Sequence, residues 1–381
     1  MIRQTTTIPV VSPPGDEPEH GRSWSSWAFI ALEVALLGSI PVLALLGFRT
    51  LLDSQAGEFA VEPGPEDAGW AAFVEPTKVG AMVDVDNGRT AGVVLVIPNG
   101  EEATGGSIIL VPGVTEIDGR TLSARAPDQA VLALEASLRL AIEAPFVADD
   151  EGWTALLGSQ TVELANPDPV PGEGDEVLIA AGRVTVAPTE LAAMSSRLPI
   201  QIDDPEALEF RRDIMWRTLL DQADFVSDVD PAAPSTAAAI AAQLDAISRG
   251  DHRIEQLPLI GAMIDSGAAE ELVRSTVAQP RGHVPGARLQ VRIIDRSGGN
   301  DLSVAAANLG RSGFEVVQIG NAAVFDDGPT QLLSVAGVDE AELVRLADVA
   351  EAATVPPSLD PEAVSTVTLL LGVHASIAAS Q

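Results

Sequence analysis

The pattern of hydrophobic and polar residues separates one long apolar run from the rest of the chain. Beginning at Trp27, about 20 successive residues are almost all apolar, which is enough to cross a bilayer core at ~1.5 Å of rise per residue. Trp24 and Trp27 stand at one rim, where indole rings favour the membrane interface, and Arg49 closes the other. The pattern predicts a transmembrane helix over residues 24–50, preceded by a cytoplasmic tail of residues 1–23.

The length of the apolar run favours a retained anchor over a cleaved signal peptide, which has a shorter run followed by small residues. Arg22 before the span indicates that the tail stays inside, so residues 52–381 are expected outside the cytoplasm of a single-pass plasma-membrane protein. Glu33 lies within the span, where an ionised carboxylate is costly. We expect it to be protonated, to lie toward the rim, or to contact a partner helix in the membrane.

After the span, residues 51–77 are rich in Gly, Pro and acidic residues and show no periodicity, which is typical of a tether. From Lys78 onward, three β-branched runs between Asn-Gly and Gly-Gly turns predict strands of one sheet: AMVDV, AGVVLVIP and GSIILVP. The segment DQAVLALEASLRLAIEAPF follows with an apolar period near 3.6, which predicts a helix. Strands followed by a helix indicate an α/β layer.

The same alternation continues along the chain. It predicts helices in DEGWTALLG, in DPEALEFRRDIMWRTLLDQA with Asp204 as its cap, and in PSTAAAIAAQLDAISR, and strands in QTVELANP and RVTVA. Together these elements form a larger α/β domain over residues 78–278. A segment rich in Pro and Gly, residues 277–287, is typical of an interdomain linker.

A third pattern fills the end of the chain. Strand LQVRIID, helix LSVAAANLGRSG, strand FEVVQIG, helix DEAELVRLADVAEA and strand STVTLLLG predict a small α/β domain with a mixed sheet over residues 286–381. The expected fold class is therefore α/β, with an N-terminal transmembrane helix, a larger α/β domain and a small C-terminal one.

Composition excludes several classes of function. The chain carries 55 acidic and 22 basic residues, a formal net charge of −33, and such a surface repels nucleic acid. The acidity itself is typical of a solubilising surface. The absence of cysteine excludes disulfides and thiolate metal sites. The 4 histidines form neither an HxxxH nor an HExxH pair, so zinc chemistry is not expected. No GxSxG elbow or Walker A loop is present.

Arginines are few, which makes their grouping around one predicted helix informative: Arg197, Arg211, Arg212 and Arg217. Guanidinium groups can hold a pyrophosphate bidentately. The alternative, which the sequence favours, is that these arginines pair with the surrounding acidic side chains: Asp203, Asp204, Glu206, Glu209 and Asp213.

Five stretches mark the segment from residue 286 to the end: VRIIDRSGG, LSVAAANL, the run GFEVV at residues 313–317, IGNA at residues 319–322, and a closing strand that ends in Leu371-Gly372. With these stretches the segment resembles the LytR_C domain of LytR-type cell-envelope proteins. Asp295-Arg296 stands where that family usually has Asn-Gly.

Residues 78–278 resemble the LytR-CpsA-Psr catalytic domain. Three stretches carry the resemblance: Arg89-Thr90-Ala91 before a strand, LVPGVT at residues 110–115, and the Arg-rich helix. Enzymes of that family are understood to move glycopolymers from polyprenyl-pyrophosphate carriers onto peptidoglycan, using arginines and aspartates with a divalent metal. The resemblance implies that Arg89, Thr115, Arg211 and Arg212 bind the ligand.

The sequence departs from that family at the chemistry itself. Ala91 replaces the family's aspartate, and Gly113 and Val114 replace its Arg-Asp pair. The resemblance therefore implies a degenerate domain with no catalytic residue and no metal, in a membrane-anchored envelope protein that acts as a binding or scaffolding module for a cell-wall glycopolymer or a polyprenyl-linked precursor. The alternative is an active polyprenyl-pyrophosphate glycopolymer transferase that uses Mg²⁺ to attach glycopolymers to peptidoglycan.

Overall fold

A computed structural model describes most of the chain after residue 62: residues 63–100, 104–172, 176–198, 205–225, 236–354, 366–373, 375 and 377. All of them belong to one compact unit, Pro63–Gln381. The expected tail and transmembrane helix, and Asp204 as a helix cap, lie outside the described residues. No helix in the described ranges combines the length and the apolar character that a membrane crossing requires.

A five-stranded sheet with the order β12-β4-β3-β2-β7 forms the centre of the larger α/β part. Its strands are β2 (Gly80–Asp86), β3 (Arg89–Pro98), β4 (Gly106–Pro112), β7 (Phe146–Ala148) and β12 (His252–Gln256). The three strands expected from AMVDV, AGVVLVIP and GSIILVP are β2, β3 and β4, and they pair antiparallel. Asn87 and Gly88 turn β2 into β3 with φ of 50° and 73°, the conformation that Asn-Gly favours in a tight hairpin.

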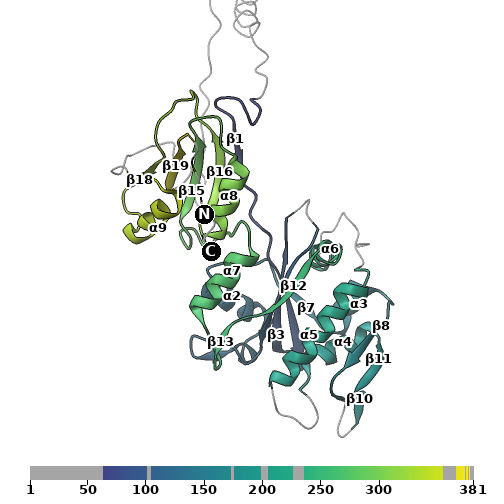
Figure 1. The fold of residues 1–381 in the computed structure, drawn as a ribbon. Helices are drawn as coiled ribbons and strands as arrows, with labels where there is room; N and C mark the ends of the chain where they lie inside the picture. Colours follow the sequence, from purple (N-terminus) through teal and green to yellow (C-terminus); the bar gives the residue numbers. More distant parts are fainter. Residues whose placement is uncertain are drawn as a thin grey trace, which may run out of the picture. The chain divides into compact units, whose positions relative to one another are not determined.

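Helices cover both faces of this sheet (Figure 1). One face carries α3 (Asp150–Leu157), α4 (Pro188–Ser196), α5 (Pro205–Gln222) and α6 (Thr236–Ser248), and the other carries α2 (Pro127–Leu138) and α7 (Ser266–Thr276). From Gly92 onward β3 is buried on both faces, so its side chains alternate between two cores and this part of its sequence is apolar, as the run AGVVLVIP indicates. In the first core the rings of Trp153 and Trp216 lie 5.6 Å apart between centroids.

The helix expected from DQAVLALEASLRLAIEAPF is shorter than predicted. It ends at Leu138 because Arg139 adopts a left-handed conformation with φ of 52°. Leu140 and Ile142 continue the apolar period and pack on the same core, but they lie in a segment that is neither helix nor strand. Periodicity alone could not locate this end, since the apolar positions continue past it.

The remaining strands of this part form small sheets. They are the pair β8 (Val162–Asn166) and β11 (Gly182–Val186), which confirms the strands expected from QTVELANP and RVTVA, the pair β9 (Val170–Pro171) and β10 (Val177–Ile179), and a four-stranded sheet of β5 (Glu116–Ile117), β6 (Arg120–Thr121), β13 (Leu259–Ile260) and β14 (Met263–Ile264). A short 3-10 helix, η1 (Leu122–Ala124), follows β6.

The C-terminal sheet is mixed, as predicted, with the order β1-β16-β15-β19-β17-β18. Its strands are β1 (Ala71–Phe73), β15 (Gln290–Asp295), β16 (Glu315–Asn321), β17 (Gln331–Ser334), β18 (Ala353–Thr354) and β19 (Val367–Leu371). β15 runs parallel to β16 and β19, whereas β17 runs antiparallel to β19. Two helices, α8 (Leu302–Arg311) and α9 (Glu340–Ala350), contribute apolar side chains to the core of this sheet.

The prediction that all of residues 51–77 form a tether is wrong for its last part. β1 comes from this segment and pairs antiparallel with β16, with Ala71 opposite Gly320. The backbone N–H of Asn321 donates to the Trp70 carbonyl at 2.7 Å, and Trp70 packs on the C-terminal core. The sheet thus recruits a strand that precedes the larger domain in sequence, although glycine, proline and acidic residues surround it.

The expected linker, residues 277–287, contains neither helix nor strand. Its backbone is nevertheless hydrogen-bonded to distant segments. The N–H of Thr77 donates to the Gln279 carbonyl, and the N–H of Ala141 donates to the Arg281 carbonyl. The domain boundaries at residues 78–278 and 286–381 stay a prediction.

Gly320 provides a test of the β1 contact, because a β-carbon built on it would lie 2.5 Å from the Trp70 carbonyl oxygen. We expect Gly320→Ala to displace β1 and to lower the free energy of unfolding by about 1–3 kcal/mol, a usual cost of overpacking. Protease cleavage within residues 63–77 should accelerate in the variant. Gly299→Ala is the control, since the nearest atom there is Ser297 Oγ at 3.8 Å. Equal behaviour of the two variants would contradict the role of β1.

Candidate ligand-binding cleft

A cleft of about 750 Å³ opens at the edge of the central sheet where β2 and β4 end and β3 begins. One wall is formed by the β2–β3 turn with the start of β3 and by Pro112, Gly113 and Val114. The other wall comes from Pro171, the end of α4 and the first turns of α5. Ligands of open α/β sheets bind outside the carboxyl ends of strands, so this position is a reasonable one for a binding site.

Two arginines, Arg89 and Arg197, line the cleft together with the carboxylates of Asp86 and Glu209. Arg89 is exposed at the start of β3, and none of the described carboxylates lies within ion-pair distance of it. Arg197 follows α4; its Nη1 donates to the Pro171 carbonyl at 2.8 Å, and its Nε lies 3.9 Å from Asp86 Oδ1. Both guanidinium groups therefore retain donors that can reach an oxyanion.

Arg211, on α5, is fully buried and points away from solvent. Its Nε donates to the Met194 carbonyl at 2.9 Å, Nη1 donates to Asp168 Oδ1 at 2.6 Å, and Nη2 donates to the Arg197 carbonyl. Burial lowers the pKa of Arg211, although Asp168 opposes this effect. Arg211 thus fastens α5 to α4 and to the loop after β8.

Arg212, the next residue of α5, is also fully buried. Its Nη1 donates to both carboxylate oxygens of Glu209 at 2.9 Å, and its Nη2 donates to Asp84 Oδ2 at 2.7 Å. Burial alone would lower the pKa of Arg212, but the two carboxylates raise it above its usual range. The guanidinium lies against Gly92, where any β-carbon would overlap it, so β3 needs glycine at this position.

Asp84, on β2, is fully buried beside this guanidinium. Burial raises the pKa of the Asp84 carboxyl, and the attraction of Arg212 and a hydrogen bond from Ser195 oppose the rise. Its Oδ1 has no partner among the hydrogen bonds between described side chains. Asp84, Arg212 and Glu209 therefore form one buried charged triad between the sheet and α5.

Thr115 lies beneath the turn after β4 and is fully buried. Its N–H donates to the Pro112 carbonyl at 3.0 Å and its carbonyl accepts from the N–H of Leu122 at 2.9 Å. Of the four predicted ligand-binding residues, Arg89 lines the cleft, whereas Thr115, Arg211 and Arg212 lie behind its walls. The structure does not bring the four side chains to one accessible surface.

Ala91, Gly113 and Val114, where the resemblance places charged residues, do line the cleft. Gly113 is fixed by packing, because a β-carbon there would overlap the Ala91 carbonyl oxygen. An arginine at residue 113 would therefore require the backbone to move. The backbone around Gly113 therefore accommodates glycine and leaves no room for the arginine that the resemblance implies at this position.

The divalent cation implied by the resemblance does not fit the donors of this cleft. Asp86 faces Arg197, and both oxygens of Glu209 accept from Arg212. Across the described ranges, no three carboxylate or imidazole side chains are grouped as metal ligands. Hard cations need several fixed oxygen ligands. Asp86 and Glu209 are instead paired with arginines, so they do not form such a ligand set.

Sequence reasoning missed Asp84 and Asp168 as partners of the two buried arginines. A signal for Asp84 exists, because it is an acidic residue inside the apolar strand AMVDV and a buried carboxylate needs a cation or donors. No comparable signal exists for Asp168, which lies in a loop between β8 and β9.

Comparisons with known proteins give structural similarity alone, since neither a protein-family model nor a curated protein matches the sequence. The LytR-Csp2A-Psr enzyme from Actinomyces oris is 17% identical, with 57% of this chain and 96% of that chain covered and a TM-score of 0.38. B. subtilis TagV is 14% identical, with 52% and 93% covered and a TM-score of 0.35. The LytR-CPS2A-psr family protein TagT with bound octaprenyl pyrophosphate lipid is 12% identical, with 53% and 90% covered and a TM-score of 0.34.

Structural similarity to LytR-CpsA-Psr family proteins thus extends over about half of the chain. It does not extend to the LytR_C resemblance, which stays a prediction.

The buried triad predicts that replacing Arg212 lowers the free energy of unfolding much more than replacing Arg217 on the same helix. Arg212→Met leaves Asp84 and Glu209 buried without their cation, and we expect a loss of about 3–5 kcal/mol in the free energy of unfolding. Arg217→Met is the matched control, because Arg217 pairs with Asp213 at the surface of α5 and should contribute less than about 1 kcal/mol. Urea denaturation measures both. Similar small losses would show that the triad does not hold the fold.

Proposed function

We propose that this chain is a single-pass, membrane-anchored cell-envelope protein that binds a polyprenyl-linked precursor or a cell-wall glycopolymer without transferring it. The observation that supports this proposal best is the use of the buried arginines. Arg211 pairs with Asp168, and Arg212 pairs with Asp84 and Glu209. Both arginines therefore hold α5 in place and have no access to a ligand. Phosphoryl transfer depends on positioned charges around the phosphate. This cleft presents Ala91, Gly113 and Val114 where the resemblance implies such charges.

The charges that remain favour binding. Arg89 and Arg197 present guanidinium donors to the cleft, which suits a phosphate or pyrophosphate group. Val114 and Leu198 stand at the same cleft with 37% and 40% of their surfaces exposed. A ligand with an anionic group joined to an apolar chain matches both features, as a polyprenyl-linked precursor does.

The proposed location of the protein in the plasma membrane rests on the apolar run near the N-terminus and not on the folded residues after it. A helix over residues 24–50 would anchor the chain in the plasma membrane and leave the cleft on the extracytoplasmic side. Glu33 would provide a contact for a partner helix within the bilayer.

The alternative, an active glycopolymer transferase, has one observation in its favour. Asp84 has a raised pKa and one carboxylate oxygen without a partner, features that are common at catalytic sites. Its burial behind Gly92 and Arg212 argues against contact with a substrate. We therefore keep transfer as an outcome of the test.

The test uses the full-length protein in detergent with a labelled polyprenyl-pyrophosphate oligosaccharide, in the presence of Mg²⁺ or Mn²⁺. We expect saturable binding and no turnover. Replacing Arg89 and Arg197 by Gln removes charged hydrogen bonds of about 1.5–3 kcal/mol each, so affinity should fall by tenfold or more. Arg183→Gln, at an exposed position of β11 with 84% of its side chain accessible, should leave affinity unchanged.

Turnover that exceeds background and disappears in the Arg89→Gln, Arg197→Gln variant would establish the transferase instead. Absence of binding to the wild-type protein would contradict the proposed function altogether.

A further inference from the structure

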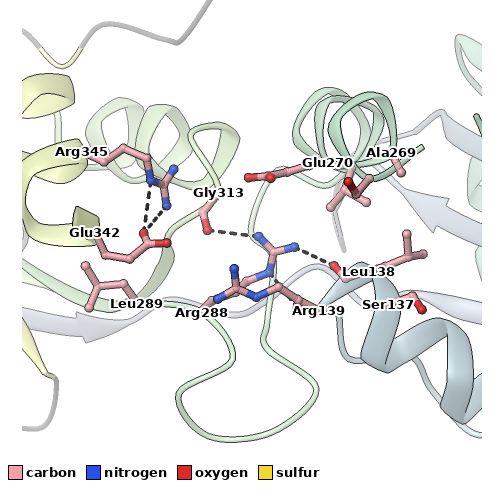
Figure 2. A pocket seen from close by; sticks show the side chains of 12 residues that line it. Ser137, Leu138, Arg139, Ala269, Glu270, Arg288, Leu289, Gly313, Glu342 and Arg345 are labelled. Carbon is pink, nitrogen blue, oxygen red and sulfur yellow. Dashed lines mark hydrogen bonds and ion pairs between the residues drawn. The ribbon is translucent and has the colours of Figure 1, made fainter. Parts of the chain in front are cut away.

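A second, smaller pocket of about 120 Å³ lies apart from the cleft, where the end of α2, α7, the residues before β15 and α9 meet (Figure 2). Three arginines line it: Arg139, Arg288 and Arg345. They come from segments that are far apart in the sequence. In a chain with a net charge of −33, such a gathering of cations is exceptional.

Arg288 is the most buried of the three, with 7% of its surface exposed. It donates to the carbonyls of Arg139 at 2.9 Å, Leu138 at 3.1 Å and Gly313 at 3.1 Å. These acceptors are uncharged, and one N–H remains on each terminal nitrogen. None of the described carboxylates is within ion-pair distance of Arg288. The C-terminal carbonyls of α2 favour a cation, but they do not neutralise it.

The surroundings of Arg288 disfavour its positive charge. Its pKa is lowered to about 10, first by burial and then by the like charges of Arg139 and Arg345, while Glu270 and Glu315 oppose the change. The side chain of Arg139 donates to the Ala287 carbonyl, and no described carboxylate lies within ion-pair distance of it. It also holds the left-handed position after α2, where glycine is the usual residue. Among the described residues, neither guanidinium group thus has a direct ion-pair partner, although Glu270 and Glu315 lie near enough to act on Arg288.

Gly313 lies where the charged side chains of Arg345, Glu270 and Arg288 converge (Figure 2). A β-carbon on Gly313 would lie 3.6 Å from Arg345 Nη1, 3.7 Å from Arg288 Nη1 and 3.8 Å from Glu270 Oε1. Arg345 is held in place by Glu342 at 2.6 Å and by the Phe314 ring at 4.1 Å from its centroid. Donors of Arg288 and Arg345 and the acceptor Oε1 of Glu270 therefore face the same small space.

We propose that this pocket binds a small oxyanion, a phosphate group or a carboxylate, between Arg139, Arg288 and Arg345. The charges of the lining support it, because three arginines face two glutamates, of which Glu342 is already paired with Arg345. The volume of about 120 Å³ suits a single small group. The oxyanion supplies the negative charge that Arg139 and Arg288 lack.

The site is independent of the proposed function, since none of its residues lines the cleft. A ligand held there joins the end of α2 to the segments around Arg288 and Arg345. Because a ligand that binds only the folded protein stabilises it, occupancy must raise the unfolding temperature.

The experiment measures thermal unfolding of the full-length protein in detergent against sodium phosphate, sodium acetate and sodium chloride at equal ionic strength. We expect phosphate or acetate to give a saturable rise in the unfolding temperature that chloride does not give. Arg139→Gln should remove the rise, and because this side chain is exposed the variant should fold. Glu270→Gln removes an opposing charge and should strengthen the apparent affinity severalfold.

The Arg89→Gln, Arg197→Gln variant of the cleft is the control and should keep the full rise. A rise with phosphate alone identifies a phosphate group as the ligand, and a rise with acetate alone identifies a carboxylate. No rise beyond that of chloride, or an undiminished rise in Arg139→Gln, would overturn the proposal. So would a rise that is lost only in the cleft variant, because the anion would then bind in the cleft.

Discussion

The buried guanidinium of Arg212 links the central sheet to α5, and the shape of the cleft depends on that link. It holds Asp84 on β2 and Glu209 on α5 through hydrogen bonds of 2.7–2.9 Å, in a region from which water is excluded. An unpaired charge in such a place would be strongly unfavourable, so the three side chains constrain one another. Gly92 completes the arrangement, because only a residue without a side chain lets the guanidinium approach β3.

Because Arg211 and Arg212 are buried and paired with carboxylates, the sequence resemblance at α5 does not place arginines in the cleft. The arginines of α5 stabilise the protein, and the wall of the cleft presents Ala91, Gly113 and Val114 where the resemblance leads one to expect charged groups. Arg89 and Arg197 line the cleft, and they are the groups on which the proposed binding without turnover rests.

Much of the fold could be predicted from the sequence, because buried strands and amphipathic helices have distinct periods. The three central strands, α5, α6 and the order of elements after residue 286 all follow from apolar patterns. Elements without such a pattern were missed: β12 has the polar sequence HRIEQ, and β1 is a short strand recruited by pairing with β16. The alternative that Arg212 pairs with Glu209 could be foreseen from their spacing on one helix, whereas its pairing with Asp84, 128 residues away, depends on the tertiary structure.

The most direct test of this account replaces the charged triad by apolar side chains of similar size, in the variant Asp84→Leu, Glu209→Met, Arg212→Met. Apolar replacement of a complete buried ion cluster is often neutral or stabilising, so the variant should unfold cooperatively. Apolar side chains of similar size should pack α5 in the same place, and Glu209 lines the cleft but directs both carboxylate oxygens to Arg212. If the triad has only this structural role, the affinity for the labelled polyprenyl-pyrophosphate oligosaccharide should stay within about twofold of the wild-type value, a difference of less than about 0.5 kcal/mol. A folded variant whose affinity falls by about tenfold or more would show that the triad contacts the ligand, and would contradict the separation of structural from ligand-binding arginines.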